Sequence, residues 1–198
     1  VLGRFDGLSV RYKPSKRVTW HAVAGQQLAS TYDDPAEEDR PFYGVSADIS
    51  LFSGQVEVSP FLIEQHRDGI LDRRAVGSYF HLRKLPVSLA GRVDYDIHHE
   101  VLNNLYLTTR YDLNENWRVN GTYDYRQSPY LTTGNALIGQ RFDDLSELEQ
   151  SLINMKLQDV AEDRTATSTS YRFGVDGNIA ADWMLSLDAA MTDYSATG

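Results

Sequence analysis

The 198-residue chain contains no cysteine, and this absence excludes disulfide scaffolds, structural cysteine–zinc sites and thiol catalysis. No stretch approaches about 18 consecutive apolar residues, so the sequence predicts no transmembrane helix. Basic residues are also scarce, with 19 Lys and Arg against 28 Asp and Glu and a formal net charge of −9. This balance argues against nucleic acid as a partner, because phosphate binding needs a basic face. Such a composition is typical of an acidic soluble protein, but transmembrane β-barrels are also polar on average.

The sequence does contain a clear period of two. From Val87 to Ile97, one face carries mostly apolar residues and the other carries charged or small ones. Successive side chains of a strand point to opposite faces, so this segment is a strand with one apolar and one charged face. The same pattern predicts ten strands, at approximately 7–13, 17–28, 42–52, 55–64, 75–84, 87–97, 104–113, 117–126, 170–177 and 182–192.

The connections between these strands differ in length. Tight turns are expected at 13–16, 53–54, 84–86, 114–116 and near 177–178, and longer polar connections at 29–41, 65–74, 98–103 and 127–169. In an up-and-down antiparallel sheet, this alternation places all the short turns at one end and all the long loops at the other. Outer-membrane barrels have this asymmetry.

Aromatic residues fall near the strand ends. Those expected at the tight-turn ends are Tyr12, Trp20, Tyr111, Trp117 and Trp183, and those expected at the long-loop ends are Phe42, Tyr43, Tyr95, Tyr123, Tyr125 and Tyr171. Two such bands suit the two interfaces of a bilayer, although strands favour aromatic residues in any setting. A lipocalin-like soluble barrel is disfavoured, because that design has eight strands and its Gly-x-Trp start is absent.

We therefore expect an all-β fold, an antiparallel up-and-down transmembrane β-barrel of the bacterial outer membrane. The whole of 1–198 is one barrel segment with a loop insert at 127–169. The chain ends without a terminal aromatic strand, which favours part of a larger barrel over a complete ten-stranded one. The barrel implies contact with outer-membrane lipid and lipopolysaccharide.

Five short stretches resemble one protein family. They are 42–48, 72–77, 94–97, 128–133 and 135–140. Together they are similar to the C-terminal barrel of large proteobacterial outer-membrane proteins that carry tetratricopeptide repeats in the periplasm. Characterised proteins of that architecture export exopolysaccharides, cellulose and poly-N-acetylglucosamine among them. The resemblance implies a passive conduit for a polysaccharide or small solute, and a periplasmic repeat domain or other envelope proteins as partners.

Under this interpretation the charged faces of the strands line the lumen. The lumen-lining candidates are Arg11, His21, Arg92, Asp94, Asp96, His98, Arg110, Asp112, Arg118, Asp124 and Arg126. A pore for a strongly anionic polymer should be mainly basic, so this mixture fits a neutral or zwitterionic cargo better. Alternatively, opposite charges on neighbouring strands pair and hold the register.

Asp94, Asp96 and His98 share one face of a strand and rise toward a long-loop end. Omptin-type outer-membrane proteases use Asp-Asp and Asp-His pairs at such a rim, but on opposite walls, and no second pair is evident. His98, His99 and Glu100 are consecutive and point apart on a strand, so they do not form a metal site. We expect no catalytic residue, no metal site and no cofactor. The alternatives to a pore are a structural or docking barrel with an occluded lumen and, less favoured, an omptin-like protease.

The insert carries a helical stripe from about 143 to 163. Leu145, Leu148, Leu152, Met155 and Val160 follow helical spacing, and Asp144 with Glu147 forms an N-terminal capping pair. The segment is strongly acidic, so it should bind anionic lipid poorly. We expect it to fold over or into the pore as a gate, or to dock on a partner, with Asp144, Leu148, Leu152 and Met155 as gating-loop candidates. The alternative is a helix in an outer loop that neither gates the pore nor binds a partner.

Overall fold

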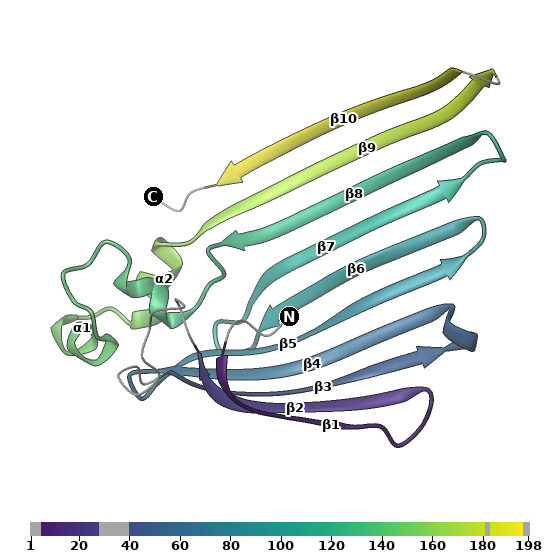
Figure 1. Cartoon of the computed structure of the whole chain (residues 1–198). Helices are drawn as coiled ribbons and strands as arrows, with labels where there is room; N and C mark the ends of the chain where they lie inside the picture. Colours follow the sequence, from purple (N-terminus) through teal and green to yellow (C-terminus); the bar gives the residue numbers. More distant parts are fainter. Residues whose placement is uncertain (1–4, 28–39, 181–182, 196–198) are drawn as a thin grey trace.

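The computed structural model describes residues 5–27, 40–180 and 183–195, which form one ten-stranded antiparallel sheet in the order of the sequence (Figure 1). The strands are β1 (Phe5–Tyr12), β2 (Val18–Gln27), β3 (Pro41–Leu51), β4 (Val56–Arg67), β5 (Ile70–Lys84), β6 (Val87–Asp96), β7 (Val101–Asp112), β8 (Trp117–Ser128), β9 (Ala166–Ala180) and β10 (Trp183–Ser195). All ten predicted strands are confirmed, with shifts at their ends. Within the described residues β1 and β10 do not pair with each other, so the sheet is open.

The two faces of the sheet differ in polarity because residues paired across neighbouring strands share a face. One row consists of Val10, Ala22, Val45, Leu62 and Val76. Its members stay exposed although they are apolar; Val45, for example, is 49% exposed. The adjacent row, on the opposite face, consists of Arg11, His21, Ser46, Phe61 and Gly77.

The polar face is the concave one. Side chains from β1 to β6 line a single cavity there, so these strands curve around it, as the curl of β1 to β5 in Figure 1 also shows. We call this the inner face and the apolar one the outer face. The sheet therefore exposes its apolar side chains on the convex surface, the reverse of a soluble barrel.

Most of the predicted aromatic bands lie on the outer face. Tyr12 pairs with Trp20 beside the first tight turn, and both rings are exposed. Tyr43 and Tyr171 are exposed toward the opposite end of their strands. Phe42 differs, because it lies one residue out of phase, pairs with Gln65 on the inner face and is buried.

The expected alternation of loop lengths is only partly correct. The connection predicted at 65–74 is a tight turn, because β4 and β5 continue to Arg67 and from Ile70, and Asp68 and Gly69 join them with positive φ. The connection predicted at 98–103 shortens to 97–100. The connection predicted at 29–41 lies mostly outside the described residues, so residues 129–165 form the one long connection that the structure describes.

The single helix expected near 143–163 is two short helices, α1 (Leu145–Ser151) and α2 (Leu157–Asp163). The chain breaks between them, where Asn154 has a φ of 64°. The prediction that Asp144 caps the first helix is confirmed, since its carboxylate accepts the backbone N–H groups of Ser146 and Glu147. Two 3-10 turns complete the helical content, η1 (Phe52–Gly54) and η2 (Thr133–Leu137). None of the helices described is long and apolar enough to cross a membrane.

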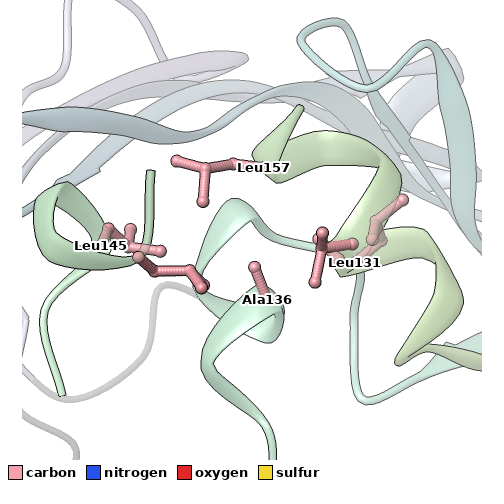
Figure 2. Close-up of a cluster of buried hydrophobic side chains, with 7 residues drawn as sticks. Leu131, Ala136, Leu145 and Leu157 are labelled. Carbon is pink, nitrogen blue, oxygen red and sulfur yellow. The ribbon is translucent and has the colours of Figure 1, made fainter. Parts of the chain in front are cut away.

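The main hydrophobic cluster lies in the long connection, while Phe42, Ala47, Ile63 and Ala75 of the strands are buried outside it. The cluster gathers side chains from η2 and the residues before it, α1 and α2, at the end of the sheet where β4 turns into β5 and β6 into β7 (Figures 1 and 2). Its buried members are Leu131, Ala136, Leu145, Leu148, Leu157, Val160 and Ala161. We call residues 129–165 the inner loop; it is a small packed unit in its own right.

Leu145→Ala should loosen the inner loop without disturbing the sheet. The side chain is fully buried, so the truncation should destabilise the loop by about 2–5 kcal/mol. Limited proteolysis should then cut within 129–165 faster, while the β-sheet circular dichroism stays unchanged. Ile153→Ala is the matched control, because Ile153 is 83% exposed in the same loop. Equal protease resistance of the two variants would contradict the assignment of this core.

Candidate functional site

Two β-bulges shape the inner face near the inner loop. In β5 the pairing with β4 shifts at Asp72, and in β7 the pairing with β6 shifts at Asn103. A bulge inserts one extra residue and re-aims its side chain. As a result, consecutive residues of one strand turn inward together: Asp72 with Arg73, and Asn103 with Asn104, all four buried.

Both extra residues hold the inner loop. The Asn103 amide donates to the carbonyl of Leu131 at 3.1 Å and accepts its N–H at 2.8 Å. The Asp72 carboxylate accepts the N–H of Gly134 at 2.6 Å, and the Thr133 hydroxyl donates to the Asp72 carbonyl. These bonds satisfy buried backbone groups of the loop, so losing either anchor leaves those groups without a partner.

A buried ion cluster lies beside the anchors. Arg73 donates to Asp94 and lies 3.5 Å from the Asp96 carboxylate, measured from Nε to Oδ2. The other Asp96 oxygen accepts the N–H groups of His98 and His99, at 2.8 and 3.0 Å. The cluster ties β5 to β6 and fixes the turn that follows β6. Removing one partner from a buried pair is costly, because the remaining charge stays buried.

Tyr130 brings the inner loop into contact with two guanidinium groups. Arg92 donates to the Tyr130 hydroxyl, and the Arg73 and Arg92 guanidiniums lie 5.4 and 5.7 Å from the ring centroid. Such contacts are cation–π interactions. Burial raises the pKa of the Tyr130 hydroxyl, so it stays neutral at physiological pH.

Arg92 also belongs to a row of paired side chains across the inner face, which we call the Tyr–Arg belt. The row runs Ser59, Tyr79, Arg92, Tyr106 and Asp124, from β4 to β8. Arg92 donates to the Asn104 side chain at 2.7 Å and lies 5.8 Å from the Tyr79 ring centroid. No carboxylate in the described part of the chain lies within ion-pair distance of it, so its direct partners are neutral.

Two grooves meet at the belt and share Ser59, Tyr79 and Arg92. The belt groove has a volume of about 550 Å³ and is also lined by Glu57, His81, Asn104, Tyr106, Asp124 and Arg126. The loop groove, about 450 Å³, is also lined by His21, Asp48, Phe61, Arg73, Asp94 and Tyr130. Both volumes fall in the range of small-molecule binding sites.

The predicted lumen residues on the strands lie on the inner face, in separate groups. His21, Arg92 and Asp94 line the loop groove, while Asp124 and Arg126 line the belt groove with Arg92. Arg110, Asp112 and Arg118 form a third group near the tight turns, where Asp112 bridges both arginines at 3.0 and 3.6 Å. Arg11 pairs with His21 in the sheet, and Asp96 belongs to the ion cluster.

His98 lies outside the strands, in the turn after β6. It contacts Gln158 of α2 at 3.3 Å between the two side-chain nitrogens. Burial lowers the pKa of His98, and the neighbouring His99 adds to this effect. A second turn also holds the inner loop. The carboxylate of Asp68, in the turn between β4 and β5, accepts the N–H of Leu145 at the start of α1, at 3.0 Å.

The gating-loop candidates have different environments. Leu148 is buried in the loop core and Leu152 packs against it, so both hold the loop together. Asp144 caps α1, and Met155 is half exposed between the two helices. None of them lines the two grooves.

Sequence reasoning missed several residues of this site. Tyr79 shares its face with His81, and the alternation in β5 could have identified it. The inward positions of Asp72, Arg73 and Asn103 were not predicted, because the bulges that create them depend on strand pairing and not on local sequence. Tyr130 follows a predicted strand, and nothing in its local sequence indicates that it turns inward.

Asp94 and Asp96 are buried and engaged with Arg73, an arrangement that uses both carboxylates as structural anchors. Among the residues that the structure describes, no group of three or more His, Asp or Glu side chains could hold a metal ion.

Comparison with known proteins places the fold. No protein-family model and no curated protein sequence matches the chain. Among solved structures, the chain is similar to the outer membrane channel DcaP of Acinetobacter baumannii, with a TM-score of 0.52 and 8% sequence identity. The alignment covers 98% of this chain and 58% of the channel, so the chain spans little more than half of that protein's length. The ten strands thus adopt the antiparallel up-and-down arrangement of an outer-membrane channel barrel.

Asn103→Ala should release the inner loop from the wall. The substitution removes two hydrogen bonds to buried backbone groups and should destabilise the docked loop by about 2 kcal/mol. This corresponds to a roughly 30-fold change in the equilibrium constant between the docked and the released loop. Amide hydrogen exchange at Leu131 should accelerate accordingly. Asn120→Ala is the control, because Asn120 bonds Asp176 on the same face and away from the loop. If the two variants exchange alike at Leu131, Asn103 is not the anchor.

Proposed function

We propose that the chain is part of an outer-membrane β-barrel that forms a channel. The observation that carries this proposal is the inverted polarity of the sheet: exposed apolar side chains cover the convex face, and charged side chains line the concave one. Lipid suits the first face and water the second. The likeness in fold to an outer membrane channel supports the same conclusion.

In a bilayer the free edges of β1 and β10 need partners. Unpaired backbone groups in hydrocarbon cost several kcal/mol each, so membrane strands form closed barrels. We therefore propose that this sheet is one part of a wider barrel, which further strands close. The greater length of the DcaP channel chain is consistent with this.

The finer proposal is passage of a polysaccharide. Charges on the inner wall are balanced in the belt groove and in the loop groove alike, which favours an uncharged cargo over a strongly anionic one. Stretches such as 72–77 resemble the barrels of outer-membrane proteins with tetratricopeptide repeats, an architecture that exopolysaccharide exporters share, and this supports the same proposal. The cargo would move passively through a hydrated lumen that the inner loop narrows.

A second candidate is a barrel with an occluded lumen that serves as a structural or docking element. The observation in its favour is the inner loop, which has its own core and is bonded to β5 and β7. Conductance separates the two candidates.

Deleting 143–163 should raise the single-channel conductance of the purified full-length protein in planar bilayers. The deletion removes α1 and α2 but leaves the anchors of Leu131 and Gly134 in place. Unchanged conductance would reject a restricting role for the helices. Absence of current in both the parent and the deleted protein would instead favour the occluded barrel.

Val45→Arg should destabilise the barrel in lipid vesicles by about 2–4 kcal/mol, because this side chain lies on the outer face near the middle of β3. Ser46→Arg is the matched control, one residue along the strand and on the inner face, where a charge stays in water. Urea titration of the folded fraction measures the difference. Equal losses for the two variants would contradict the membrane orientation.

A further inference from the structure

We propose that the belt groove and the loop groove are contiguous subsites that bind successive rings of an uncharged sugar chain. The inference rests on the proposed channel function and names the residues that would contact the cargo. The two grooves share Ser59, Tyr79 and Arg92, so one linear ligand can occupy both without leaving the wall.

Aromatic rings line both grooves. Tyr79 and Tyr106 flank Arg92 in the Tyr–Arg belt, and Tyr106 is 36% exposed. Phe61 lies 5.9 Å from Tyr79 between ring centroids, and Tyr130 faces the same groove from the inner loop. A sugar ring has an apolar C–H face and a rim of hydroxyls, so it can stack on such rings while its rim stays hydrogen-bonded.

The polar groups around these rings both donate and accept. In the loop groove, Asp48 accepts from Ser59 at 2.8 Å and bonds His21 at 2.9 Å. In the belt groove, Asn104 and Arg126 lie beside Glu57 and Asp124. Sugar hydroxyls need both kinds of partner, because each donates one hydrogen and accepts through two lone pairs.

The charges that line the two grooves argue against an anionic ligand. In the loop groove two arginines, Arg73 and Arg92, stand against Asp48 and Asp94. In the belt groove Arg92 and Arg126 stand against Glu57 and Asp124. Arg92 is common to both grooves, so together they hold three arginines and four carboxylates, and an anionic ligand would lose hydration on entry and meet no net opposite charge.

Arg92 is the central contact of the site. Its guanidinium is held in place by the neutral side chains of Asn104 and Tyr130. A guanidinium fixed by neutral groups can donate to a sugar oxygen without first breaking an ion pair. The same arginine links the wall to the inner loop, so an occupied loop groove would lie against Tyr130.

The test measures binding and conductance separately on the full-length protein. Maltohexaose is the probe, and saturation-transfer nuclear magnetic resonance in detergent micelles gives its dissociation constant. We expect Tyr79→Ala and Tyr106→Ala each to weaken binding about five- to tenfold, the loss of one stacking partner. Tyr79→Phe keeps the ring and should keep most of the affinity. Tyr194→Ala is the matched control, because Tyr194 shares the inner face but lines neither groove.

Each outcome decides one of the two claims. If the protein conducts ions but does not bind maltohexaose, the sugar site is wrong and the channel function is retained. If it binds maltohexaose but does not conduct, the channel function is wrong and the sugar site is retained. Tighter binding of hexagalacturonate than of maltohexaose overturns the assignment to an uncharged ligand. If Tyr194→Ala weakens binding as much as Tyr79→Ala, the site lies elsewhere.

Discussion

The position of the inner loop depends on two extra residues in the sheet, Asp72 and Asn103. On an uninterrupted strand the period of two would turn one residue of each buried pair toward the apolar outer face. The bulges instead turn both residues of each pair inward, so that β5 and β7 each present an additional hydrogen-bonding side chain to residues 131–134. Tyr130 is thereby placed over Arg92, and the wall and the loop together form one of the two grooves.

The molecule separates its two kinds of apolar surface. The inner loop buries its leucines as a soluble domain does, around Ala136 and between short helices. The sheet buries little on its outer face, where residues such as Leu62 and Phe173 are exposed. Between these surfaces lies a polar layer in which Arg73 joins Asp94 and Asp96. This polar layer lets the inner face of the sheet contact both water and the packed inner loop.

Alternation was sufficient to predict the strands and their faces. It placed Arg92 and Asp94 on the inner face because every second residue from 87 to 97 is apolar. It failed at 65–74, where inward polar residues such as Gln65 look like a loop, and it overlooked Asp68-Gly69, a strong two-residue hairpin signal. The bulges and the inward fold of Tyr130 could not be predicted, because they depend on which residues pair across strands and on contacts far apart in the sequence.

The inner loop interrupts a hairpin, and this has a consequence for how the chain folds. Ser128, the last residue of β8, pairs with Ala166, the first residue of β9, so the insert begins and ends at adjacent positions of one ladder. An unstructured connection of that length would impose a closure entropy on the hairpin. A loop that has packed its own core holds its two ends together and removes much of that entropy. Collapse of the leucine cluster therefore brings β8 and β9 together, and a defect in that cluster would slow their pairing without changing the finished sheet.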